Sequence, residues 1–259
     1  MDTMKRFTLF LALYCMVMTG NVVAQESLKN VMIYTKNGEG FVHDNIDKSV
    51  VALRKICDDL SISYVVSDDP SIFTTDFSMK FDAVIFSNTN NEAFDTDEQR
   101  KIFQKFIRNG GGFVGIHSAC GSERDWPWFS AMVGAKFVRH PDFQPFDIKV
   151  LNKNHPSTSF LPDTWSWEDE CYFMNQINPD INVLLAVDLT TINDPEMETY
   201  PGDTFGNLFP LAWYHEYDGG REFFTALGHD KKHYKDKNFI QHLRGGIVWV
   251  LELKEDGNL

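Results

Sequence analysis

Short apolar segments alternate with longer amphipathic segments over the first half of the chain. Residues 81–87 form a largely apolar run, which is typical of a parallel strand that is covered on both faces. Between Ile46 and Leu60, apolar side chains recur at helical spacing instead. The alternation predicts a doubly wound α/β fold with a mainly parallel sheet and helices on both faces. The strands expected in this sheet are residues 31–34, 63–66, 81–87 and 113–117.

The segments that follow predict one more helix and then a change of pattern. Asp95 and Glu98 have the spacing of a capping box, so we expect a helix to begin there and to end at Asn109-Gly110. The turn Asp218-Gly219-Gly220 predicts an antiparallel hairpin between the two strands that flank it. The strands expected in this second half are 146–151, 182–188, 211–217 and 221–228, and a helix over 236–253 follows them.

The N-terminus has the three-part pattern of a secretory signal peptide. Two basic residues precede an apolar run over residues 7–18, and small residues come before Gln25. The run is short for a membrane span, so we expect residues 1–24 to be removed, with a retained anchor as the alternative. Residues 25–259 are then expected to form a single α/β domain that is periplasmic or secreted and has no integral membrane segment.

Composition and cysteine count argue against several classes of protein. Acidic residues outnumber basic ones by 37 to 24 without any basic cluster, so we expect no nucleic-acid partner. A neutral ligand such as a sugar is compatible with this charge. The three cysteines after residue 24 are too few for a disulfide framework, although one Cys120–Cys171 bond stays open. No Walker or GxGxxG motif occurs, so we expect no nucleotide cofactor, while homo-oligomerisation stays open.

An apolar strand ends abruptly at a histidine in the stretch GGGFVGIHSACG. Open α/β enzymes commonly place a nucleophile on such a sharp strand-to-helix turn, and here His117 occupies the vertex. A neutral imidazole in that position can act as a general base, polarise a carbonyl or bind a metal. Ser118 and Cys120 are weaker candidates for a nucleophile, and a core histidine satisfied by the backbone is the alternative interpretation.

Three other segments place polar side chains near the same edge of the predicted sheet. His229 and Asp230 follow an apolar strand and precede the last helix, so we expect both to lie near His117. Asp230 can instead cap the helix. The stretch WEDECY offers three successive carboxylates, of which Glu170 is expected to reach the site unless the whole stretch is a solvated loop. His43 follows a Gly-rich loop and is a candidate lid contact.

The segment WYHEY places a histidine between aromatic residues inside a strand. Strand alternation puts Trp213, His215 and Tyr217 on one face, which suits a wall that faces a sugar, with ordinary packing as the alternative. His140 and His155 each precede a proline, and we interpret both as structural residues of turns.

With these residues in view, the sequence resembles the trehalose-utilisation (ThuA-like) family over residues 29–253. The segments that carry the resemblance are GGGFVGIHSA, HPSTSFLPDTWSWEDECY, LAWYHEYDGGREFFTALGHD and FIQHLRGGIVW. It implies a class I glutamine amidotransferase-like fold, which is a flavodoxin-like sheet with elaborations. In true amidotransferases the elbow carries cysteine, and a His-x-Glu follows a late strand. This sequence has His117 and His229-Asp230-Lys231 at those places, so we expect no glutaminase activity.

The resemblance also implies carbohydrate as the substrate class. We expect an enzyme (a hydrolase, lyase or isomerase) that acts on a disaccharide, glycoside or keto-sugar, either by histidine and carboxylate acid–base chemistry or with a divalent metal. A non-catalytic module that binds a sugar or a protein partner is the alternative. The residues expected to act in catalysis or hold the metal are His117, Glu170, His215 and His229, and those expected to bind substrate are His43, Ser118, Trp213, Tyr217 and Asp230.

Overall fold

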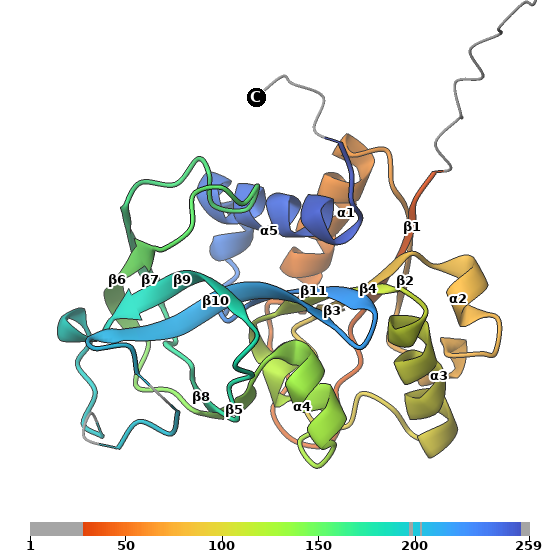
Figure 1. Cartoon of the computed structure of the whole chain (residues 1–259), viewed down its shortest axis with the longest axis horizontal. Helices are drawn as coiled ribbons and strands as arrows, with labels where there is room; N and C mark the ends of the chain where they lie inside the picture. Colours follow the sequence, from red (N-terminus) through yellow and green to blue (C-terminus); the bar gives the residue numbers. More distant parts are fainter. Residues whose placement is uncertain (1–27, 197–198, 203, 255–259) are drawn as a thin grey trace, which may run out of the picture.

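A nine-stranded sheet runs through the described part of the chain, which is residues 28–196, 199–202 and 204–254 of a computed structural model (Figure 1). The signal peptide predicted over residues 1–24 lies outside the described residues. Within them, no helix is both long and apolar enough to cross a membrane. In sheet order the strands are β2 (Ser63–Ser67), β1 (Asn30–Tyr34), β3 (Ala83–Ser87), β4 (Gly112–Ile116), β11 (Gly220–Thr225), β10 (Leu208–Tyr217), β9 (Asn182–Asp188), β6 (Gln144–Val150) and β7 (Thr164–Asp169).

The five strands from β2 to β11 are parallel, which confirms the predicted α/β fold. Strands β3 and β4 are buried along their whole length, as their apolar sequences require. In the sheet, Phe113 of β4 lies between Val84 of β3 and Glu222 of β11. All five strands therefore end at one edge, where β4 leads into His117 and β11 leads towards His229.

The other half of the sheet is antiparallel and begins with the predicted hairpin of β10 and β11. Its turn has positive φ at Asp218 (49°) and Gly219 (104°), as a two-residue hairpin turn requires. A Cβ at Gly219 would lie 2.8 Å from the carbonyl oxygen of Arg108, so glycine is needed there. Because Ala212 pairs with Thr225, the first residues of β10 continue past the carboxyl edge of the parallel strands. Strands β9, β6 and β7 are attached to this extension.

Helices α1 (Ile46–Asp59) and α5 (Lys237–Val250) lie on one face of the sheet (Figure 1). The other face carries α3 (Asp97–Arg108) and α4 (Pro127–Val133), with the short α2 (Phe77–Lys80) beside α3. Other short elements are the 3-10 helices η1 (Pro70–Ile72), η2 (His117–Gly121), η3 (Leu189–Thr191) and η4 (His233–Lys235), and a two-stranded sheet of β5 (Lys136–Arg139) and β8 (Phe173–Asn175). The sequence-based expectation lacked α2, α4, β5, β7 and β8.

The predicted start of α3 is wrong by one residue. Thr96 is the N-cap and Gln99 completes the capping box, whereas Asp95 forms an ion pair of 2.7 Å with Lys36. Both pairs have the spacing of a capping box, so spacing could not distinguish them. The predicted start of the last helix agrees with the structure, because Asp236 caps α5.

Aromatic rings fill the space between the sheet and α3. The ring of Phe86 lies 5.2 Å from that of Phe113 and 5.6 Å from that of Phe103, and all three are buried. On the opposite face, a Cβ at Gly246 would lie 2.4 Å from the Phe223 ring, so this glycine permits the close approach of α5 to the sheet. The core thus holds the parallel strands rigidly and fixes the edge from which the site residues come.

Candidate functional site

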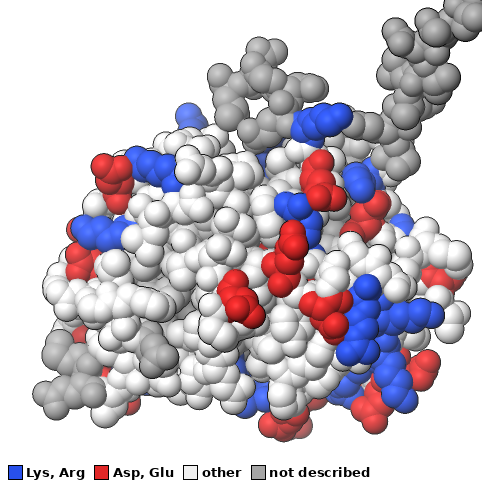
Figure 2. Space-filling model, viewed as in Figure 1, with Lys and Arg blue, Asp and Glu red and all other residues white. Residues whose placement is uncertain are grey.

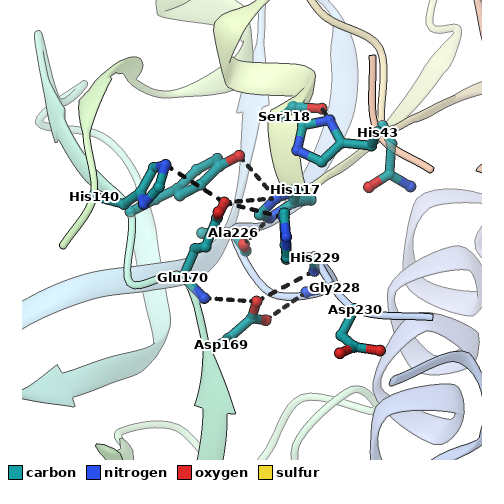
Figure 3. Close-up of polar contacts among 12 residues, drawn as sticks. His43, His117, Ser118, His140, Asp169, Glu170, Ala226, Gly228, His229 and Asp230 are labelled. Atoms are coloured by element: carbon teal, nitrogen blue, oxygen red, sulfur yellow. Dashed lines mark hydrogen bonds and ion pairs between the residues drawn. The ribbon is translucent and has the colours of Figure 1, made fainter. Parts of the chain in front are cut away.

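Four loops near the carboxyl edge of the parallel strands bring three histidines and a glutamate together (Figure 3). His43 lies between β1 and α1, His117 begins η2, Glu170 follows β7 and His229 follows β11. The ring centres of His117 and His229 are 5.4 Å apart, and that of His43 lies 4.8 and 5.3 Å from them. One nitrogen or carboxylate oxygen from each residue lies within 4.8 Å of those of the other three. We call these four residues the histidine–glutamate cluster.

His117 stands at the vertex of the sharp turn after β4 and is completely buried. Its φ of 52° is in the left-handed region, which costs a non-glycine residue energy and requires support from its surroundings. Nδ1 lies 2.7 Å from the carbonyl oxygen of Ala226, so it carries the hydrogen and leaves the Nε2 lone pair free to accept. The Tyr172 hydroxyl donates to Nε2 at 2.8 Å. Burial and then the neighbouring His43 lower the pKa of His117 well below its ordinary value, so this imidazole is neutral.

The Glu170 carboxylate lies among the imidazoles. Its Oε2 is 3.1 Å from Nδ1 of His229, 3.7 Å from Nε2 of His117 and 3.6 Å from Nε2 of His140. The short contact with His229 is not aligned as a hydrogen bond, so Nδ1 of His229 is a buried atom without a well-directed partner. Burial raises the pKa of Glu170, but the contact with His229 and the charge of His140 outweigh it and lower the pKa. Burial lowers the pKa of His229, and the nearby Glu170 reverses this to a net increase.

His43 and Ser118 meet on the side of the cluster opposite Glu170 (Figure 3). The Ser118 hydroxyl lies 3.2 Å from Nδ1 of His43, which leaves Nε2 of His43 for the cluster. Both residues are buried, and burial, followed by the effect of His229, lowers the pKa of His43 to about 4. His43, expected as a lid contact, is therefore a neutral member of the cluster, and Ser118 is its hydrogen-bond partner.

Asp169 fixes the loop that carries His229, and its role was not foreseen from the sequence. Its buried carboxylate accepts backbone N–H bonds from Gly228 (2.8 Å), His229 (3.3 Å) and Glu170 (2.8 Å). On the other side, Asn45 donates to the carbonyl oxygens of Gly228 and His229 at 2.8 and 2.7 Å. Burial raises the pKa of Asp169, while the N–H donors act in the opposite direction. The inward alternation of Trp165, Trp167 and Asp169 in β7 is the period-two pattern that could have indicated this position.

Tyr172 and His140 complete the surroundings of Glu170, and neither was assigned to the site from the sequence. The Tyr172 ring packs against His117 with ring centres 4.2 Å apart and an interplanar angle of 32°. Burial raises the pKa of Tyr172 well above the ordinary value, so its hydroxyl remains a donor. His140 was expected to be only a turn residue, but its Nε2 lies 3.6 Å from Glu170. Its side chain is 36% exposed, which places it at the solvent side of the site. His155 is buried and bonded to Ser157 away from the cluster, in agreement with its structural assignment.

Three of the expected site residues lie away from the histidine–glutamate cluster. His215 pairs across the hairpin with Glu222, which lies level with Phe113, roughly 13 Å along the strand direction from His117. The reason is that β10 runs antiparallel, so its second half leads away from the carboxyl edge. Nε2 of His215 donates to the Met132 carbonyl at 2.8 Å, so this residue packs against α4. Trp213 donates to the Val133 carbonyl at 2.8 Å, and Tyr217 packs against Trp128.

Two other candidates lie near the cluster without joining it. The Asp230 carboxylate accepts the N–H of Lys232 at 2.8 Å and points away from the imidazoles (Figure 3). The Cys120 thiol is 3.5 Å from the carbonyl oxygen of His117, and burial raises its pKa to about 12, so it is a poor nucleophile. Cys57, Cys120 and Cys171 are free and buried, so the disulfide that the sequence left open is not formed.

Two exposed phenyl rings border the histidine–glutamate cluster. Phe41 is 62% exposed, and its ring packs edge-on against His43 at 4.8 Å. Phe143 is 37% exposed, and its ring centre lies 6.0 Å from that of His229. The sequence signal for the first was an apolar pair, Phe41-Val42, in a polar Gly-rich loop. Sequence reasoning had instead placed the aromatic side chains of the site at Trp213 and Tyr217.

A groove of about 780 Å³ lies apart from the cluster, beside α3 and the loop that follows η2. Its lining includes Arg100, Glu123 and Trp126. Arg100 pairs with Glu123 at 2.6 Å, and Figure 2 shows basic and acidic side chains interspersed over this part of the surface. The groove contains no histidine or cysteine among its lining residues, and we place the functional site at the histidine–glutamate cluster instead.

Comparisons with known proteins give a family and a fold. The family model for ThuA, described as trehalose utilisation, matches residues 30–250. A crystal structure described as ThuA-like from Bacteroides uniformis is 24% identical, with a TM-score of 0.70 over 89% of this chain and 94% of that one. Another from Parabacteroides merdae is 21% identical, with a TM-score of 0.69 over 90% and 93%. No curated protein matches the sequence significantly.

Proposed function

The chain belongs to the ThuA family, and we propose that it is an enzyme of carbohydrate catabolism that acts on a disaccharide, glycoside or keto-sugar at the histidine–glutamate cluster. The main support for this proposal is that polar groups capable of catalysis converge at one edge of the sheet, next to two exposed phenyl rings. The family's description as trehalose utilisation supports this substrate class. The signal-peptide pattern of residues 1–24 supports action in the periplasm or outside the cell, which fractionation of the host would test.

The rings of Phe41 and Phe143 support a sugar ligand. Exposed aromatic rings beside a polar cluster are a common property of binding sites, since large apolar side chains gain by being covered. A pyranose has apolar C–H faces that stack on such rings and hydroxyls that need hydrogen-bond partners. Phe41 and Phe143 offer the first kind of contact, and the neighbouring Glu170 and His140 offer the second.

The cluster supports chemistry at a hydroxyl, carbonyl or glycosidic oxygen. Tyr172 supplies a hydroxyl proton donor beside His117, and His140 lies at the solvent side, where a proton can be exchanged. The elbow residue is a histidine, and the nearby Cys120 thiol is protonated at neutral pH, so a glutaminase reaction through a thiolate is not supported.

Turnover by the purified protein tests this proposal. Trehalose, other disaccharides and their 3-keto forms are offered, and products are identified by mass spectrometry. Replacement of His117 by Ala or of Glu170 by Gln should lower kcat/KM at least 100-fold. Glu168→Gln is the matched control, because Glu168 is an exposed carboxylate near Glu170 that pairs with Lys232 outside the cluster. If the protein binds a sugar but does not turn it over, it is a non-catalytic binding module and not an enzyme. If both cluster variants keep the turnover of the parent protein, the cluster is not the active site.

The exposed ring of Phe41 gives a separate test of the substrate class. Phe41→Ala removes a stacking surface but no cluster atom, so KM for the sugar should rise about tenfold while kcat changes little. Circular dichroism checks that the fold is kept. A KM equal to that of the parent protein would remove the support that this ring gives to a sugar ligand.

A further inference from the structure

We propose that His43, His117, Glu170 and His229 bind one divalent first-row transition-metal ion. The proposal rests on the proposed function for the use of the ion, but binding can be measured without turnover. Three imidazole nitrogens and one carboxylate oxygen lie within 4.8 Å of one another at the end of four separate loops. Such a convergence of imidazole and carboxylate donors is the arrangement that a metal ion stabilises.

The distances fit one ion with modest adjustment. Metal–nitrogen and metal–oxygen bonds of about 2.0–2.2 Å place two ligands of the same ion roughly 3 to 4 Å apart. Oε2 of Glu170 already lies 3.1 Å from Nδ1 of His229 and 3.7 Å from Nε2 of His117. The upper limit of 4.8 Å within the cluster exceeds this spacing by about 1 to 2 Å, so an ion would draw the more distant donors closer together.

Hydrogen bonds from outside the cluster orient the donors towards its centre. The carbonyl of Ala226 holds the hydrogen of His117 on Nδ1, so the Nε2 lone pair points inwards. Similarly, the Ser118 hydroxyl forms a hydrogen bond with Nδ1 of His43, so Nε2 of His43 remains available to the cluster. Nδ1 of His229 is buried and lies 3.1 Å from Oε2 of Glu170 without a well-directed hydrogen bond, so these two donor atoms meet at the centre of the cluster.

The donor set selects the class of metal. Imidazole nitrogens suit Zn²⁺, Fe²⁺, Co²⁺, Ni²⁺ and Cu²⁺, whereas Ca²⁺ and Mg²⁺ prefer oxygen ligands throughout. The side chains of Glu170 and His229 are 15% and 26% exposed, so solvent reaches the cluster at these two residues. A sugar oxygen or water can enter there, and the ion would polarise a carbonyl or lower the pKa of bound water.

Tyr172 gives the proposal a distinctive consequence. Its hydroxyl now donates to Nε2 of His117, which is the lone pair that the metal would take. The hydroxyl must therefore give up this bond when the ion binds. Tyr172→Phe removes the competitor and keeps the stacked ring, so metal affinity should stay equal or increase up to tenfold.

Metal binding by the full chain tests the assignment. Protein stripped with a chelator is titrated with Co²⁺, whose visible absorption reports its ligands, and Zn²⁺ is then used to displace it. We expect about one equivalent by elemental analysis, no displacement by millimolar Mg²⁺ or Ca²⁺, and affinity lowered at least tenfold in Glu170→Gln and His229→Ala. Glu168→Gln is the matched control and should bind as the parent does, and circular dichroism confirms that each variant is folded.

The outcomes separate this proposal from the proposed function. Absence of binding, or one equivalent that Glu170→Gln and His229→Ala leave unchanged, overturns the metal site. Undiminished sugar turnover in fully stripped protein overturns a catalytic use of the ion while the proposed function stands. One equivalent of metal lost in the cluster variants, with no turnover of any sugar, supports the metal site and removes the proposed function.

Discussion

A buried, unpartnered carboxylate in β11 predicts a specific dependence of stability on pH. Glu222 is 1% exposed, and neither of its oxygens has a hydrogen-bond partner. Across the hairpin it faces His215, whose Nδ1 has no partner either. Burial raises the pKa of Glu222 well above its ordinary value, so the folded protein holds this carboxyl protonated at pH values where the unfolded chain has ionised it.

The sign and size of the effect follow from this raised pKa. A group whose pKa is higher in the folded state contributes its stability below the unfolded pKa, about 4.3, and loses it as the pH rises through the folded pKa. Each pH unit in this window costs about 1.4 kcal/mol of folding free energy. Glu222→Gln cannot ionise, so relative to the parent protein it should gain about 2 kcal/mol between pH 4 and pH 6.

Urea unfolding of both proteins at pH 4, 5, 6 and 7 measures this difference. Comparison of parent and variant removes the contribution of every other titrating group that the substitution leaves alone. Glu216→Gln on the neighbouring strand is the matched control, since it makes the same substitution at an exposed glutamate. Equal pH profiles for the parent protein and Glu222→Gln would refute the argument that Glu222 is protonated in the fold.

Two further predictions concern the residues that the structure reassigned. Asp169→Asn should lower turnover at least tenfold and the free energy of unfolding by about 2 kcal/mol. The reason is that the single oxygen of an amide cannot replace a carboxylate that accepts N–H bonds at both oxygens. Steady-state kinetics measure the first effect and urea unfolding measures the second. Trp213→Phe should lower stability by about 2 kcal/mol through the lost bond to the Val133 carbonyl and leave kcat within about twofold; a large loss of activity would return Trp213 to the site.

Local patterns were sufficient for the parallel half of the fold and for its central site residue. Strands covered on both faces have apolar sequences, and the helices between them have apolar side chains at helical spacing, so the alternation was visible in the sequence. His117 was identifiable because the strand, the turn and the small residues after the turn follow one another in the sequence, so one short stretch contains the whole pattern. Even the error at α3 was only a choice between two adjacent capping pairs, Asp95 with Glu98 and Thr96 with Gln99.

The direction of each strand at the sheet edge decides which side chains meet, and this direction depends on long-range pairing. His215 and Glu170 both lie in or beside strands of the second half, and their sequences did not distinguish them. Because β10 pairs antiparallel to β11, its later residues return towards the amino ends of the parallel strands and take His215 away from the site. A local pattern contains no information about that pairing.

The same long-range geometry explains how Glu170 reaches the imidazoles from β7, which is not a neighbour of β4 or β11. The first residues of β10 project past the carboxyl edge, and β9, β6 and β7 continue the sheet from this projection. Asp169, the last residue of β7, then accepts the N–H of Gly228 in the loop that follows β11, and this bond joins the two halves. The site is therefore assembled across the fold: its imidazoles come from loops after parallel strands, and its carboxylate comes from the antiparallel half. A chain whose antiparallel half is displaced should keep its histidines and lose the cluster, which makes Asp169 as important to the site as any residue that lines it.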